Sequence, residues 1–160
     1  MSDEVEIGRG KRGRRAYTLD DIALVPARRT RDPEDVNVGW QIDAYHVDIP
    51  VMAAPMDSVM SPETAIAFGR LGGIGVLDLD GLWTRYEDPA PILDQIAHLG
   101  EEESIASLQR VYSEPIKPSL ITARLKQLRE AGVVVAGKLS PQRVQKYWRA
   151  VVDAGVDLFI

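Results

Sequence analysis

The most constraining feature of the sequence is a strand–helix–strand unit between Ile49 and Leu77. An apolar run from Ile49 to Ala53 has the length and the flanking proline of a buried strand. A serine-proline pair at 61–62 has the residue types of a helix N-cap and first helical position, and two glycines at 72–73 end the helix before the apolar run 74–77. This order of elements predicts a parallel crossover.

The same signals for helix starts and strands recur along the chain. Helices are predicted after Asp88-Pro89, over 119–131 and after Ser140-Pro141, and strands over 133–136 and 156–160. From Val144 to Val152 the last helix has apolar residues at i, i+3, i+4, i+7 and i+8, which predicts a single apolar stripe. Strands that alternate with helices favour an α/β protein with parallel strands, either a closed (β/α)8 TIM barrel or an open doubly wound sheet.

The length of the chain bears on which architecture it forms. The sequence has 160 residues and ends inside a predicted strand, whose backbone groups would lack a neighbouring strand. A closed βα barrel takes about 250 residues. We therefore expect an N-terminal part, roughly the first half, of a longer barrel.

Composition indicates an ordinary globular protein. The chain is 45% hydrophobic, 27% charged and has no cysteine, which gives no disulfide framework to suggest export. No apolar run approaches the roughly 20 residues that span a bilayer, and the N-terminus lacks the apolar core of a signal peptide. We expect a cytoplasmic protein without a membrane partner.

Basic residues gather in the first fifth of the chain, although the net charge is −5. They are Arg9, Lys11, Arg12, Arg14, Arg15, Arg28, Arg29 and Arg31. One interpretation is an arm that binds nucleic acid by releasing counterions from phosphate. The other is a solvated, disordered leader over residues 1–16. We favour the leader, and predict no nucleic-acid partner, because no aromatic residue is interleaved and the rest of the chain is acidic.

Three segments together resemble a known family. YTLDDIALVPAR begins at Tyr17, IPVMAAPMDSVM begins at Ile49 and GGIGVL begins at Gly72. In this order and at these spacings they resemble the N-terminal half of the IMP dehydrogenase and GMP reductase family, and AGVDLFI at the end of the chain looks like the family's fourth barrel strand. The resemblance implies that residues 17–160 are the N-terminal part of one βα barrel. It also implies a purine nucleoside monophosphate at the C-terminal ends of the strands, NAD or NADP beside it, and a homotetramer.

The resemblance also implies a choice of reactions. In IMP dehydrogenases a cysteine attacks the purine C2, hydride passes to NAD, and water releases xanthosine monophosphate. In GMP reductases a similar cysteine supports loss of ammonia and hydride delivery from NADPH. The family's cysteine loop and the adenosine part of its cofactor site come after the fourth strand, so the catalytic residues are expected downstream of Ile160.

The loop after the first strand supplies the candidate substrate-binding residues Ala54, Met56 and Asp57. Residues at the C-terminal end of a barrel strand face the site, and a thioether can lie against an aromatic base. By resemblance, Ala54 and Met56 match positions that line the nucleotide pocket; packing at the barrel mouth is the alternative for Met56. For Asp57 a ribose hydroxyl is one partner, but a cap on backbone amides is the interpretation we favour.

Two departures from the family bear on function. After GGIG the relatives normally place a histidine and a polar neighbour, whereas this chain has Asp78 and Asp80. An acidic pair changes the local electrostatics, so Asp78 is a candidate for the rim of the site, with a loop hydrogen bond as the alternative. Second, the interval 100–132 is too short for the pair of CBS regulatory domains found in most IMP dehydrogenases. This favours a GMP reductase or the CBS-free IMP dehydrogenase-related paralogue of bacteria.

Three functions are therefore open. They are an IMP dehydrogenase, a GMP reductase, and a catalytically silent paralogue that binds a nucleotide or other barrels. The two histidines, His46 and His98, have no metal-ligand spacing, so no metal site is predicted.

Overall fold

The computed structural model describes residues 4–25 and 32–160, which form two compact units divided between Asn37 and Val38. The predicted boundary after residue 16 therefore lies inside the first unit. Arg28, Arg29, Arg31 and the end of the YTLDDIALVPAR motif lie outside the described residues. No helix in the described part of the chain is long and apolar enough to span a bilayer.

The first unit contains a β-hairpin where the sequence predicts a disordered leader. Strand β1 (Glu4–Gly8) pairs antiparallel with β2 (Lys11–Arg14). Glutamates at 4 and 6 lie opposite arginines at 14 and 12, and such cross-strand pairs of opposite charge stabilise a hairpin. Gly10, with φ of +69°, supplies the left-handed residue of the turn. The prediction of disorder is thus wrong for residues 4–14, because the basic cluster has an acidic strand beside it. Two short 3₁₀ helices follow, Leu19–Asp21 and Pro33–Asp35.

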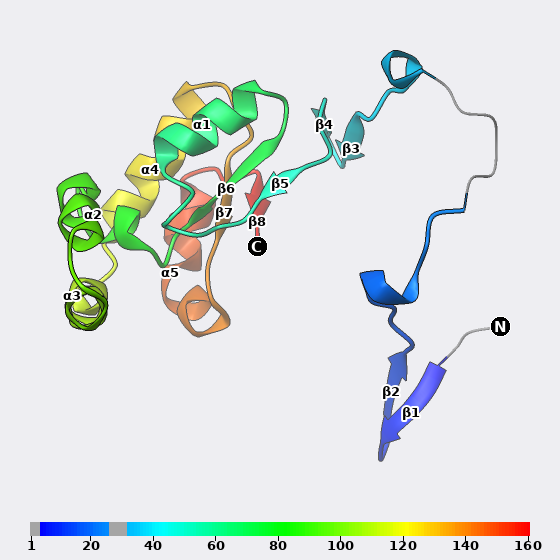
Figure 1. The fold of residues 1–160 in the computed structure, drawn as a ribbon, viewed down its shortest axis with the longest axis horizontal. Coiled ribbons are helices and arrows are strands. Elements are labelled where there is room, and N and C mark those ends of the chain that lie inside the picture. Colours follow the sequence, from blue (N-terminus) through cyan, green and yellow to red (C-terminus); the bar gives the residue numbers. More distant parts are fainter. Residues whose placement is uncertain (1–3, 26–31) are drawn as a thin grey trace. The chain divides into compact units, whose positions relative to one another are not determined.

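The second unit is an α/β structure built on four parallel strands (Figure 1). Its strands and helices, in chain order, are β3 (Trp40–Ile42), β4 (Tyr45–Val47), β5 (Met52–Ala53), α1 (Pro62–Arg70), β6 (Ile74–Asp78), the 3₁₀ helix Leu82–Thr84, α2 (Ala90–Ala97), α3 (Glu101–Ser113), α4 (Pro118–Glu130), β7 (Ala136–Lys138), α5 (Pro141–Asp153) and β8 (Leu158–Phe159). Strands β5, β6, β7 and β8 are neighbours in that order, and every pair is parallel. The predicted parallel α/β architecture is confirmed.

Strand boundaries differ from the prediction in two places. The third parallel strand begins at Ala136 rather than Val133. Just before it, the Val135 amide donates to the Asp157 carboxylate instead of to a neighbouring strand, and the Val135 carbonyl accepts from the amides of residues 157 and 158. The first is a two-residue edge strand, and its Met52 and the preceding Val51 are 39% and 48% exposed rather than buried. An edge strand has a sheet partner on one side only, which leaves its apolar side chains less covered.

The main core lies between one face of the sheet and helices α1, α4 and α5. Leu77 and Leu79 from the β6 segment are buried against Leu125 of α4 and Val151 of α5. Figure 1 shows these helices together on one side of the strands. The opposite face of the sheet carries a smaller cluster, in which Val47 of β4 covers Ile74 and Val76 of β6 and Ala136 of β7. Side chains of β6 therefore alternate between two buried faces.

Helix α5 does not bury its whole predicted stripe. Tyr147 and Val151 are buried, but Trp148 and Val152 are 42% and 50% exposed. Tyr147 and Val151 belong to the main core, with Val144 packed against it, whereas Trp148 and Val152 are not part of that core.

Close packing of α1 on the sheet depends on a glycine. A Cβ built on Gly75 of β6 would lie 2.5 Å from Ala65 Cα, so no other residue fits there without moving the helix.

At the N-terminal ends of the strands, Asp157 connects several elements. Its carboxylate accepts hydrogen bonds from the Val135 amide at 2.9 Å, Tyr45 Oη at 2.7 Å and Arg129 Nη2 at 2.9 Å. Burial alone would raise the pKa of Asp157, but these donors outweigh burial and hold that pKa below its usual value. The carboxylate therefore joins the β3–β4 hairpin, α4 and the approach to β7.

We predict that Asp157→Asn lowers the free energy of unfolding by about 1–3 kcal/mol at pH 7, because an amide cannot accept all three bonds. The folded-state pKa is lowered, so this stabilisation is present above the unfolded-state pKa of about 3.9 and is lost as the pH falls through the folded value. Denaturation at pH 7 and pH 3 measures the difference. The exposed Asp153→Asn is the matched control, and a loss that stayed constant down to pH 3 would contradict this account.

Candidate functional site

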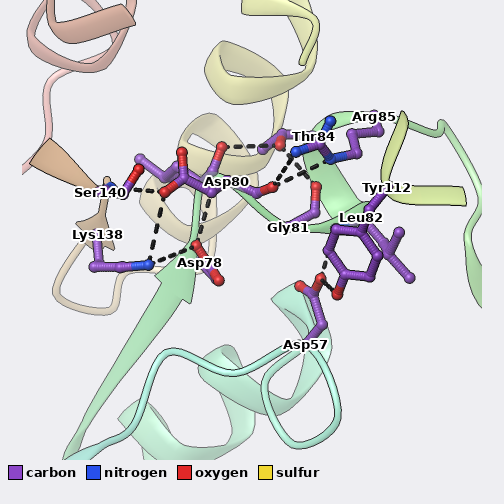
Figure 2. Close-up of polar contacts among 11 residues, drawn as sticks. Asp57, Asp78, Asp80, Gly81, Leu82, Thr84, Arg85, Tyr112, Lys138 and Ser140 are labelled. Atoms are coloured by element: carbon purple, nitrogen blue, oxygen red, sulfur yellow. Dashed lines mark hydrogen bonds and ion pairs between the residues drawn. The ribbon is translucent and has the colours of Figure 1, made fainter. Parts of the chain in front are cut away.

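The loops that follow β5, β6 and β7 meet at one edge of the sheet, because parallel neighbours end on the same side. The loop after β5 contains Ala54, Met56 and Asp57, and Asp78 is the last residue of β6, so all four residues singled out from the sequence lie at this edge. Figure 2 shows the polar groups at this edge.

The loop after β5 is a single tight turn. The Met56 amide donates to the Ala54 carbonyl at 2.9 Å, and the Met60 amide donates to the Met56 carbonyl at 2.8 Å. Met60 is buried beneath the turn, whereas Ala54 is exposed and Met56 is 51% exposed. In the described structure Met56 is thus a surface side chain rather than packed core. Its contact with a purine base stays a prediction.

Asp57 is engaged by the protein itself. Its Oδ2 accepts from the Leu82 amide at 2.7 Å and from Tyr112 Oη at 2.6 Å, as Figure 2 shows. Its Oδ1 is buried without a hydrogen-bond partner among the described residues. The backbone cap, which the sequence favours, is therefore the role that the structure shows. Contact with a ribose hydroxyl stays a prediction.

Gly81 makes room for the Asp57 carboxylate. A Cβ built on Gly81 would lie 2.0 Å from Asp57 Oδ1. Its φ of −82° is open to any residue, so space rather than backbone conformation requires glycine here. The carboxylate is thus pressed against the backbone at the start of the 3₁₀ helix Leu82–Thr84.

Asp78 and Asp80 share one lysine across the sheet. Asp78, the last residue of β6, is the register partner of Lys138, the last residue of β7. Lys138 Nζ lies 3.5 Å from Asp78 Oδ1 and 3.6 Å from Asp80 Oδ2. The Asp80 amide donates to Asp78 Oδ1 at 3.0 Å, and the Ser140 amide donates to Asp80 Oδ2 at 2.6 Å. The loop hydrogen bond considered for Asp78 is therefore present, together with an ion pair.

Burial raises the pKa of the Asp78 carboxyl above its usual value, and the nearby charges of Asp57 and Asp80 raise it further. The Asp80 amide and the Lys138 ammonium lower that pKa but do not cancel the effect of burial. The raised pKa of Asp78 is thus due first to burial and then to the neighbouring carboxylates at this edge.

Arg85 holds the segment after β6 through hydrogen bonds to backbone carbonyls. Its Nε and Nη2 donate to the Asp80 carbonyl at 3.2 and 2.9 Å, and its Nη1 donates to the Glu114 carbonyl. Its guanidinium also lies over the Tyr112 ring, 5.6 Å from the centroid. The end of α3 is therefore attached to the loop that carries Asp80.

Sequence reasoning missed Gly81, Arg85, Tyr112 and Lys138. Lys138 follows the apolar run 133–136 within two residues, so the alignment of parallel strand ends could have placed it beside Asp78. Tyr112 had no such signal, since it lies 55 residues from Asp57 in the sequence.

The charges at the edge limit what it can bind. Carboxylates at 57, 78 and 80 outnumber the cations of Lys138 and the buried Arg85. Such a surface suits hydroxyl and amide donors, but it does not fit the diphosphate of NAD or NADP, which needs cations or free backbone amides. No group of three metal-binding side chains is present among the described residues.

A parallel α/β fold with its polar loops at the carboxyl ends of the strands is the framework of many nucleotide-binding enzymes. The family model described as "IMP dehydrogenase / GMP reductase domain" matches residues 16–160. The chain belongs to this family.

The chain is similar to several members. An uncharacterised oxidoreductase of Mycolicibacterium smegmatis is 44% identical over 98% of this chain and 43% of its own length. An inosine-5′-monophosphate dehydrogenase of Methanocaldococcus jannaschii is 42% identical over 40% of this chain and 13% of its own length. The crystal structure of an IMP dehydrogenase/GMP reductase-like protein from Corynebacterium glutamicum is 40% identical, with a TM-score of 0.81 over 98% of this chain and 43% of that one. The chain thus spans less than half the length of the M. smegmatis and C. glutamicum relatives.

We predict that Gly81→Ala lowers the free energy of unfolding by about 1–3 kcal/mol, because the added methyl group forces Asp57 away from its two donors. In an Asp57→Ala background the same methyl group has space, so the added cost falls below about 0.5 kcal/mol. Denaturation of the four proteins of this double-mutant cycle measures the coupling. If Gly81→Ala lowered the free energy of unfolding equally with Asp57 and with Ala at position 57, the steric contact between residue 81 and Asp57 would be contradicted.

We predict that Asp78→Asn becomes more stable relative to the wild type as the pH rises from 3 to 7. A raised folded-state pKa means that the contribution of Asp78 to stability is present below its unfolded-state pKa, about 3.9, and is lost as the pH rises through the folded value. Asparagine imitates the protonated form at every pH. Denaturation across this range tests the sign, and a relative stability that fell with rising pH would show that the pKa is lowered.

Proposed function

We propose that this chain forms the first half of the TIM barrel of a purine nucleotide oxidoreductase of IMP dehydrogenase type. The observation that carries the proposal is the turn after β5, which presents Ala54 and Met56 at the carboxyl edge of a parallel sheet in a chain of this family. The proposed reaction converts IMP, NAD and water to XMP and NADH.

The sequential order of β5 to β8 supports a barrel over an open doubly wound sheet, whose strand order reverses at a switch point. The relatives that align over nearly the whole chain are more than twice its length. The proposal therefore assigns to sequence beyond Ile160 the remaining strands, the catalytic residues and the groups that hold the cofactor's diphosphate.

Within this chain the residues have separate roles. Ala54 and Met56 form a wall for the purine base, where a polarizable thioether gains contact with an aromatic ring. Asp57 serves the site by holding that turn in place. Asp78, with Lys138, forms the rim, where carboxylates receive hydroxyl or amide donors of the ligands.

Two alternatives rest on specific observations. GMP reductase, with NADPH, is supported by the interval between α2 and β7, which α3 and α4 fill without a regulatory domain. A silent paralogue that binds a nucleotide is supported by Asp78, which stands where the family normally places a histidine. Assembly as a homotetramer and location in the cytoplasm stay predictions from the family resemblance.

Turnover by the full-length protein separates these functions. Production of NADH from IMP is the expected result, and oxidation of NADPH with GMP would favour the reductase. Calorimetric binding of a purine monophosphate without either turnover would favour the silent paralogue. Absence of both binding and turnover would overturn the proposed function.

We predict that Met56→Ala weakens binding of the purine monophosphate about tenfold, equivalent to about 1.4 kcal/mol, because the base loses the thioether contact. Val59→Ala is the matched control, since Val59 is equally exposed on the same turn, at 52% against 51%. Titration calorimetry of the full-length protein measures both. Equal affinities of the two variants would remove Met56 from the binding site.

A further inference from the structure

We propose that Tyr112 of α3 is a positioning residue for the nucleotide-binding turn 54–60, acting through Asp57. This inference rests on the proposed function and extends it to a helix that lies outside the strand-end loops. Nothing in the sequence around Tyr112 connects it to the turn, and the connection follows from the contacts of the folded chain.

The central contact is the hydrogen bond of 2.6 Å from Tyr112 Oη to Asp57 Oδ2. The same oxygen accepts from the Leu82 amide, and the Gly81 backbone closes the space around Oδ1. The carboxylate is therefore held by two donors on one oxygen and by steric contact at the other. Only one of these three restraints, the tyrosine hydroxyl, comes from a side chain.

The tyrosine is itself held in place. Arg85 lies over its ring and is anchored to the Asp80 and Glu114 carbonyls. Arg85 is 94% buried, since its exposed fraction is 6%. Tyr112 itself is 40% exposed, so its ring is restrained by this buried guanidinium and by the hydrogen bond to Asp57. Restraint before a ligand binds lowers the entropy that binding costs.

Asp57 transmits this position to the binding residues. It is the second residue of the turn that the Met56 carbonyl closes with the Val59 and Met60 amides. Because the turn is a single hydrogen-bonded unit, a shift of Asp57 moves Met56 and Ala54 with it. Tyr112 therefore sets the place of the base-binding wall without touching the ligand.

The hydroxyl keeps its proton over the working range of pH. Burial raises the pKa of Tyr112 above its usual value of about 10, and the Asp57 charge raises it further. Tyr112 is therefore a hydrogen-bond donor to the carboxylate at neutral pH, and the link does not depend on pH there.

The test is Tyr112→Phe in the full-length protein, which keeps the ring beneath Arg85 and removes only the hydroxyl. Tyr86→Phe is the matched control, because Tyr86 Oη donates to the Val111 carbonyl of the same helix at 3.1 Å and does not touch Asp57. Two quantities are measured: amide hydrogen exchange of the turn 54–60 without ligand, and calorimetric affinity for IMP and GMP.

We expect exchange in the turn to become about tenfold faster in Tyr112→Phe, and the dissociation constant for the nucleotide to rise about five- to tenfold. KM should rise with little change in kcat, because the hydroxyl does not reach the reacting atoms. Tyr86→Phe should leave the turn and the affinity unchanged.

The inference and the proposed function fail in different ways. A wild-type protein that binds no purine monophosphate would reject the proposed function, while the exchange measurement would still test the link to the turn. Unchanged exchange in Tyr112→Phe would overturn the inference. Equal nucleotide affinity of the wild type and Tyr112→Phe would also overturn it. The same holds if Tyr86→Phe lost as much nucleotide affinity as Tyr112→Phe.

Discussion

The parallel pairing of β5, β6, β7 and β8 is the constraint from which the rest of the second unit follows. Parallel neighbours need a crossover between them, so helices α1, α4 and α5 cover one face and bury Leu77, Leu125 and Val151 there. The same pairing brings the carboxyl ends of the strands to one edge. Residues as far apart in sequence as Asp78 and Lys138 thereby become register partners.

At that edge Asp57 joins three segments that the sheet only brings near one another. Its carboxylate is the acceptor for the 3₁₀ helix after β6 and for the end of α3, and it belongs to the turn after β5. A direct role for this carboxylate in ligand binding would compete with these contacts. These contacts agree with the proposal of two separate roles, in which Met56 and Ala54 contact the ligand and Asp57 holds their turn in place.

Local sequence signals predicted the elements well where caps and breakers are strong. Ser61-Pro62 begins α1, with the Thr64 amide donating to Ser61 Oγ at 3.1 Å, and Ser140-Pro141 begins α5. The hairpin at residues 4–14 was not predicted, because the glutamates of β1 pair with the arginines of β2 across the strands. Such cross-strand pairing is not visible in the linear sequence. Tyr112 and Gly81 were missed because their partner, Asp57, is close only in the folded chain. The family resemblance pointed to the turn 54–60 as the proposed binding site, but the network that holds this turn came from the structure.

The central account is that a purine nucleotide binds at the carboxyl edge of the sheet, over the turn that Asp57 holds. Amide hydrogen exchange of the full-length protein with and without a purine nucleoside monophosphate tests this most directly, because it reports the location of binding and not only its strength. The account predicts slower exchange in residues 54–61 and 78–85 when the nucleotide is present, with the β3–β4 hairpin unchanged. Protection confined to the hairpin or to the outer faces of α2 and α5, with the strand-end loops unaffected, would contradict it.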